Sequence, residues 1–254
     1  MNIRLLVLGV SLVSLAAVAD VTRQEEFSFE LADGGRISLE NVNGDVTVKG
    51  GDGSQVEIVA LKKAGKQEYL DGIEIRIDHS VDAIRIETRH PDKGISSWFD
   101  WGSDSSGSVT YTLSVPASAN LDAVETVNGD LSIAGVTGVV KASTVNGDVK
   151  AKDLSADARV ETVNGEVDIT FASFTGNQKA DCESVNGRLV VNLPADASAS
   201  VNAETINGGI DGSDFGLKTN KGFVGQDMSG AIGEGSGRLS LSTVNGSIKV
   251  KSGN

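Results

Sequence analysis

The stretch Val124-Glu125-Thr126-Val127-Asn128-Gly129-Asp130-Leu131 contains the tripeptide Val-Asn-Gly that decides the fold. A Val-Asn-Gly or Ile-Asn-Gly tripeptide occurs seven times, with the pairs Asn43-Gly44, Asn128-Gly129, Asn146-Gly147, Asn164-Gly165, Asn186-Gly187, Asn207-Gly208 and Asn245-Gly246. From Asn128 onward, successive asparagines are separated by 18, 18, 22, 21 and 38 residues. Repetition on this scale is typical of proteins that stack one structural unit on the next.

The seven copies share side-chain types when they are aligned on the asparagine. The residue four positions before it is apolar, the residue two before it is small and polar or amide, and the residue three after it is aliphatic. Each copy therefore predicts a strand, an Asn-Gly bend and a second strand. The interval of 38 residues before Asn245 corresponds to about two units, with a degenerate copy near Val224-Gly225-Gln226-Asp227.

Two architectures use such a unit. Asn-Gly is the strongest short signal for a β-hairpin, which would give an antiparallel β-meander or sandwich. In a hairpin, however, the Val or Ile before each asparagine would lie on the same outer face as Glu125, and seven exposed β-branched residues would be unusual. If Asn-Gly is instead a corner, this residue can point inward, and Asn and Gly supply a permissive backbone. We therefore predict an all-β parallel β-solenoid with coils of roughly 18–22 residues.

The chain divides into three predicted regions. Residues 1–19 have a positive start, a short apolar run and the sequence Ala17-Val18-Ala19 before Asp20, which is typical of a secretory signal peptide. Residues 20–116 contain alternating strands and are expected to form an N-terminal β-strand cap, with an aromatic loop at 90–108. Residues 117–254 form the predicted solenoid, and no transmembrane segment is expected in the mature chain.

Further motifs carry a resemblance to a known family. They are the segment Tyr111-Thr112-Leu113-Ser114-Val115-Pro116, the serial Glu-Thr-Val-Asn-Gly-Asp units, and residues 230–246 with the last Val-Asn-Gly. Over residues 36–250 the chain resembles the bacterial "putative-adhesin" family of β-repeat envelope proteins, whose domain is of unknown function. The resemblance implies a β-solenoid, a location outside the cytoplasm and no established catalytic residues.

Composition limits the partners. The formal net charge is −13, and phosphate binding requires a basic surface, so we expect no nucleic-acid partner. Stacking would align Glu125, Glu161 and Glu183 in one column, and Asp130 and Asp148 in another. Two interpretations of these columns stay open: a stripe that binds divalent cations, and a solvated acidic face that keeps the protein soluble.

Few residues offer chemistry. The two histidines, His79 and His90, match no zinc spacing, and Cys182 lies in the apolar column, which favours a buried free thiol. We therefore predict no catalytic residue, no metal site and no cofactor. The aromatic residues of the 90–108 loop, Trp98, Phe99 and Trp101, either cover one end of the solenoid or contact a partner.

The sequence thus predicts a non-enzymatic exported repeat protein, an adhesin or an envelope binding or scaffold module, in the periplasm, at the cell surface or secreted. Its expected partner is a protein or polysaccharide of the cell envelope. Two alternatives are kept. One is a carbohydrate-active β-helix enzyme, since paired carboxylates can serve as acid and base. The other is a periplasmic envelope-stress module.

Overall fold

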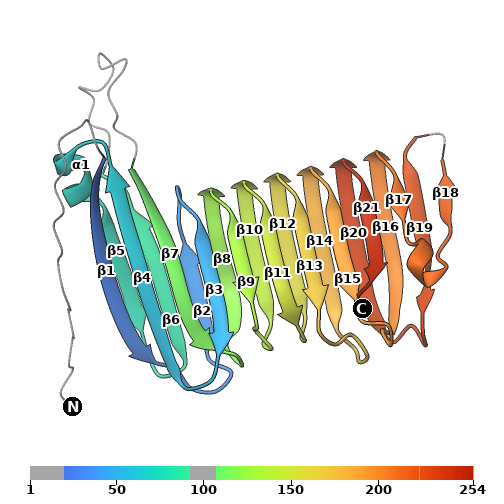
Figure 1. The fold of residues 1–254 in the computed structure, drawn as a ribbon, viewed down its shortest axis with the longest axis horizontal. Coiled ribbons are helices and arrows are strands. Elements are labelled where there is room, and N and C mark those ends of the chain that lie inside the picture. The colour runs from blue at the N-terminus through green and yellow to red at the C-terminus, as the bar shows by residue number, and fades with distance from the viewer. Residues whose placement is uncertain (1–19, 92–106, 223, 254) are drawn as a thin grey trace.

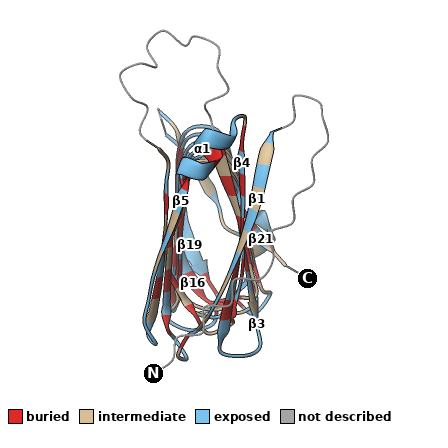
Figure 2. Cartoon of the chain, turned by 90° about the vertical axis from the view of Figure 1, so that its left-hand side faces the viewer, coloured by how far each residue is buried: buried red, intermediate tan, exposed pale blue. Residues whose placement is uncertain are grey.

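A computed structural model describes residues 20–91, 107–222 and 224–253. Two long sheets face each other along the molecule (Figures 1 and 2). In spatial order, sheet A contains β1 (Val21–Glu30), β4 (Gln55–Ala64), β7 (Gly107–Pro116), β3 (Val46–Gly51), β9 (Leu131–Ala134), β11 (Val149–Leu154), β13 (Val167–Phe171), β15 (Leu189–Leu193), β21 (Ile248–Ser252) and β17 (Ile210–Asp211). Sheet B contains β5 (Glu74–His79), β6 (Ala83–Arg89), β2 (Arg36–Glu40), β8 (Asn120–Asn128), β10 (Val140–Asn146), β12 (Ala158–Asn164), β14 (Lys179–Asn186), β20 (Gly237–Asn245), β16 (Ala199–Asn207), β19 (Gln226–Ile232) and β18 (Thr219–Lys221).

Each coil of the repeat array consists of one strand in sheet B, an Asn-Gly bend and one strand in sheet A. Neighbouring coils pair in parallel and in register, so that Val160 lies beside Cys182 in sheet B and Val167 beside Leu189 in sheet A. Alternate side chains point between the sheets, where most of the buried residues are Val, Ile, Leu and Ala. The parallel β-solenoid predicted from the repeat columns is confirmed, and the antiparallel meander is not adopted by the array.

One step of that prediction was wrong. The Val or Ile before each asparagine does not point inward: Val127 and Val163 are 38% and 39% exposed, and Ile206 is 51% exposed. The reason is that the strand stays extended up to the asparagine, so its alternation continues into the bend. The residues one and three before the asparagine therefore face solvent, and those two and four before it face the core.

The last coil of the chain is not the last coil of the stack. β20 pairs in parallel with both β14 and β16, and β21 with both β15 and β17, so this coil lies between two earlier ones (Figure 1). The predicted degenerate copy near residues 224–227 was also wrong. That segment lies at the turn and start of the β18–β19 hairpin, which pairs antiparallel with β16 and covers the end of sheet B. A short 3-10 helix, η2 (Ser213–Phe215), precedes it.

The N-terminal strands are built differently. β1 and β7 pair antiparallel with β4, β5 pairs antiparallel with β6, and the helix α1 (Gln67–Gly72) connects β4 to β5. The first repeat, β2 and β3, stacks directly on β8 and β9 although 68 residues of sequence (52–119) separate the two coils. Residues 36–51 therefore lie within the stack, although they fall inside the predicted N-terminal cap. The boundary between residues 116 and 117 stays a prediction.

The predicted 90–108 loop falls mostly on residues 92–106, which lie outside the described residues, as do Trp98, Phe99 and Trp101. Gly107 and Ser108 belong to β7. The predicted signal peptide, residues 1–19, also lies outside the described part of the chain. Among the described helices, none is long and apolar enough to cross a membrane.

Candidate functional site

The seven asparagines form one continuous ladder of side-chain amides. The Asn164 Nδ2 donates to Asn146 Oδ1 at 2.9 Å, and the Asn186 Nδ2 donates to Asn164 Oδ1 at 2.9 Å. The same bond joins every neighbouring pair along the stack, in the order Asn43, Asn128, Asn146, Asn164, Asn186, Asn245, Asn207. Amide ladders of this kind stabilise in-register parallel stacks, so each asparagine holds the next coil in register.

The glycine after each asparagine is required by close approach of neighbouring coils. A side-chain carbon at Gly165 would overlap the Gly147 carbonyl oxygen, and the same clash recurs at Gly129, Gly147 and Gly187. Only Gly44 among the seven has a positive φ, at 119°. The predicted reason, backbone freedom at a corner, therefore applies to one copy, whereas in the others glycine is needed because another backbone occupies the space.

The small polar column lies just inside the bend. The Thr162 Oγ1 donates to the Gly147 carbonyl at 3.0 Å, and the Thr144 Oγ1 donates to the Gly129 carbonyl at 3.0 Å. These hydroxyls are buried, with Thr162 only 4% exposed. Since a buried carbonyl without a donor is costly, the column supplies the donor that each tight bend needs.

The acidic column two positions after the asparagine also bonds from coil to coil. The Asp148 backbone N–H donates to Asp130 Oδ1 at 2.8 Å, and the Glu166 N–H donates to Asp148 Oδ1 at 2.8 Å. Arg188 continues the column as the cationic partner of Glu166, at 2.6 Å. Among the described residues, no group of three or more His, Cys, Asp or Glu side chains could hold a metal ion. The carboxylates of this column serve as acceptors for backbone amides.

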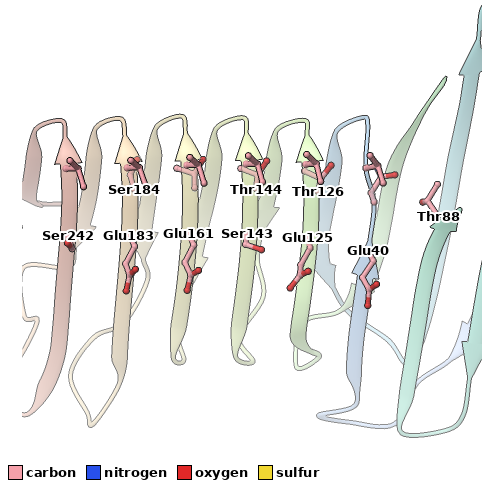
Figure 3. A pocket seen from close by; sticks show the side chains of 18 of the residues that line it. Glu40, Thr88, Glu125, Thr126, Ser143, Thr144, Glu161, Glu183, Ser184 and Ser242 are labelled. Atoms are coloured by element: carbon pink, nitrogen blue, oxygen red, sulfur yellow. The ribbon is translucent and has the colours of Figure 1, made fainter. Parts of the chain in front are cut away.

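A different surface emerges on the outside of sheet B, which we call the Val–Glu face. Its first row contains the residue before each asparagine. Its second row contains the residue two positions earlier in the strand, and six members of this row, from Glu40 to Ser242, are labelled in Figure 3. The first row is Val42, Val127, Val145, Val163, Val185, Val244 and Ile206. The second row is Glu40, Glu125, Ser143, Glu161, Glu183, Ser242 and Glu204.

Most of the Val–Glu face lines an open groove of about 640 Å³. The groove runs across neighbouring coils and contains exposed apolar groups beside carboxylates. The groove is continuous because the strands pair in register and each coil contributes the same two outward positions. The arrangement is a linear surface on which each coil contributes an exposed Val or Ile and, two positions earlier in the strand, a Glu or Ser.

The charge of this face changes along the stack. Near the N-terminal strands, Arg85 pairs with Glu40 at 2.7 Å, and the hydrogen bond from Arg89 holds the pKa of Glu87 below its usual range. Along the array, Arg159 pairs with Glu161. Within residues 20–91, 107–222 and 224–253, the three carboxylates of Glu125, Glu183 and Glu204 form no ion pair. The acidic character of the face is therefore strongest from β8 to β16.

The other chemically versatile residues lie away from this groove. Cys182 points into the core, and burial raises the pKa of its thiol, so the nucleophilic thiolate is not populated near neutral pH. His79 packs on Phe29, with ring centroids 4.4 Å apart, and burial lowers the pKa of His90. The structure does not bring these residues together.

The sequence contained a signal for the Val–Glu face. The recurring β-branched residue before Asn and the glutamate two positions earlier are both visible in the repeat columns. The prediction that the β-branched residue points inward places these two columns on different faces, so it does not reveal the shared surface.

Comparison with known proteins places the chain in a family. The family model described as Toastrack DUF4097 matches residues 36–251. A solved structure described as a "putative cell adhesion protein" from Clostridium sporogenes is 16% identical with a TM-score of 0.53, covering 91% of this chain and 100% of that chain. A "putative adhesin" from Bacteroides fragilis is 10% identical with a TM-score of 0.43, covering 89% of this chain and 96% of that chain. A comparison with curated proteins found no match. At these identities the first structure supports the fold alone, whereas the family model covers most of the sequence and confirms the resemblance seen in its motifs: the chain belongs to the Toastrack DUF4097 family.

Proposed function

We propose that this protein is a non-enzymatic, exported binding or scaffold module of the cell envelope, and that the Val–Glu face is the surface it presents to its partner. The observation that carries the proposal is the row of seven exposed Val and Ile side chains, 36–51% exposed, along one side of a rigid stack. Isolated apolar residues on a surface are ordinary, but a contiguous exposed apolar row marks an interaction site. The signal-peptide pattern of residues 1–19 supports export.

The geometry also bears on the enzyme alternative. A glycosidase needs two carboxyl groups that flank one bond in a cleft. Here the carboxylate of Asp130 accepts the backbone N–H of Asp148, and Glu161 is paired with Arg159 on a regular strand. These contacts favour structural roles for both residues, in support of a binding module.

The proposal is tested by co-sedimentation of the exported, purified protein with isolated cell envelopes. The test variant changes three residues of the apolar row, Val145→Thr, Val163→Thr and Val185→Thr, which keep the β-branched shape and add a hydroxyl. The matched control changes three exposed apolar residues elsewhere, Leu61→Thr, Val81→Thr and Val224→Thr. We expect the test variant to lose at least tenfold in envelope affinity and the control to bind like the wild type.

If the test variant and the control bind cell envelopes equally, the Val–Glu face is not the surface that binds the partner. Release of sugars from envelope polysaccharides, abolished by Asp130→Asn or Glu161→Gln, would replace it with the enzyme alternative. Protease digestion of the protein in intact cells, compared with permeabilised cells, then separates surface display from a periplasmic location.

A further inference from the structure

The spacing and the charge of the Val–Glu face define the kind of partner that fits it, and this inference rests on the proposed function. From Val127 to Ile206 the apolar row crosses six neighbouring strands of sheet B. Strands in a sheet are about 4.8 Å apart, so the row extends for about 24 Å with one apolar group at each step. A partner must therefore present its own apolar groups in a line of similar repeat.

Two regular peptide conformations can be compared with this repeat. An α-helix returns an apolar side chain to the same face about every 5.4 Å, close to the spacing of the row. A β-strand laid along the row would return one only about every 6.7 Å. The helix follows the row more closely, and a length of about 24 Å corresponds to roughly 16 helical residues.

The second row defines the charge of the partner. It lies two residues away along each strand, about 6.7 Å from the apolar row, within reach of a long side chain at the border of a helix. Glu125, Glu183 and Glu204 have no cationic partner among the described residues, and the formal net charge of the chain is −13. A cationic partner would neutralise these carboxylates.

The same charges argue against a second copy of this chain. Two copies that joined their apolar rows face to face would either place the two acidic rows on opposite sides of the joint row, where the carboxylates gain no cationic partner, or place them close together in a region with little solvent. Like charges at short range in such a place repel strongly. An anionic partner meets the same obstacle.

We propose that the Val–Glu face from β8 to β16 binds a cationic amphipathic α-helix of about 16 residues. Its apolar stripe would lie on Val127, Val145, Val163, Val185, Val244 and Ile206, and Lys or Arg along one border would face the glutamate row. The N-terminal part of the face contributes less, because Arg85 already neutralises Glu40 there.

The test measures fluorescence anisotropy of three labelled 16-residue peptides with the purified exported protein. The first contains Leu at helical spacing with Lys at the other positions. The second replaces every Lys with Glu, and the third has the composition of the first with Leu and Lys alternating at strand period. We expect the first to bind at least tenfold more tightly than either of the others, with an affinity that falls as salt is raised.

Two protein variants locate the binding. Glu125→Gln, Glu183→Gln and Glu204→Gln together should weaken binding of the first peptide at least tenfold and flatten its salt dependence. The matched control, Glu30→Gln, Glu57→Gln and Glu234→Gln, removes three exposed carboxylates elsewhere and should bind like the wild type. The triple Val→Thr variant should also bind the first peptide more weakly. Its control, Leu61→Thr, Val81→Thr and Val224→Thr, should bind that peptide like the wild type.

Several results would overturn the inference. Equal binding of the first and second peptides would exclude charge recognition, and equal binding of the first and third would exclude the helix. A dimer of the free protein that the triple Val→Thr variant dissociates would assign the face to a second copy. If envelopes bind through the valine row but no Lys peptide binds, the inference fails while the proposed function stands.

Discussion

The two ends of each coil follow different rules. At the Asn-Gly end, every bend has the same Asn-Gly pair and the same asparagine bonds to its neighbours. At the opposite end, the connections contain five residues at 135–139, three at 155–157, seven at 172–178 and five at 194–198. The variation in repeat length, from 18 to 22 residues, therefore lies in these connections and in the lengths of the strands that they join, and not in the Asn-Gly bend.

The difference has a steric cause. At the Asn-Gly end the backbones of neighbouring coils touch, so one added carbon has no space. At the other end some connections bury a residue, such as Val136 or Phe174, but they also contain exposed segments, such as residues 175–177 and 195–196, and exposed loops tolerate insertions. A glycine that occurs at the same position in every repeat thus indicates a contact between coils, rather than a backbone conformation that the turn requires.

The largest effect is expected from a single carbon added at the constant end. In Gly165→Ala, the new Cβ would overlap the Gly147 carbonyl oxygen, and the coils would have to separate. We expect the free energy of unfolding to fall by about 3 kcal/mol, measured by urea or thermal denaturation.

The control for this change is Gly176→Ala in the 172–178 connection. The new Cβ there would meet only the flexible end of Gln178, at 3.2 Å, and the expected change is within about 0.5 kcal/mol. Similar losses at both positions would show that glycine at the Asn-Gly end is not set by coil contact.

A smaller effect is expected from loss of one buried hydroxyl at the same end. Thr162→Val keeps the shape of the side chain but leaves the Gly147 carbonyl without the Thr162 donor at 3.0 Å. The free energy of unfolding should fall by about 1–2 kcal/mol, because an unsatisfied buried acceptor loses its solvation. Thr112→Val, at an exposed position of β7, should be nearly neutral, and a loss as large as that at Thr162 would refute the role of the hydroxyl.

The smallest effect is expected in the asparagine ladder. Asn164 has one ladder bond to each neighbouring coil, whereas Asn207, at the end of the stack, has only its bond to Asn245. Asn164→Ala should lower the free energy of unfolding by about 1 kcal/mol, and Asn207→Ala by about half of that. Equal losses in thermal denaturation would argue that the ladder does not act bond by bond.

Much of this fold could be predicted from the columns of the repeat. The inward positions four before and three after the asparagine, such as Val160 and Val167, were identified because burial follows a period of two in a strand. The candidate site was harder. The prediction that its valines point inward rests on the rule that exposed β-branched residues are unusual, and the seven exposed Val and Ile residues do not follow that rule.

The sequence by itself determined the strand, bend and strand of each coil, and the parallel stacking of the coils. These follow from the local alternation in the eight residues from four before to three after each asparagine, and from the repetition of that pattern along the chain. Tertiary structure alone decided that the coil of Asn245 lies between those of Asn186 and Asn207, because all three coils carry matching columns and fit the same neighbours. It also decided that the valine row faces solvent, since only the structure shows that each strand stays extended, with alternating side chains, up to the asparagine.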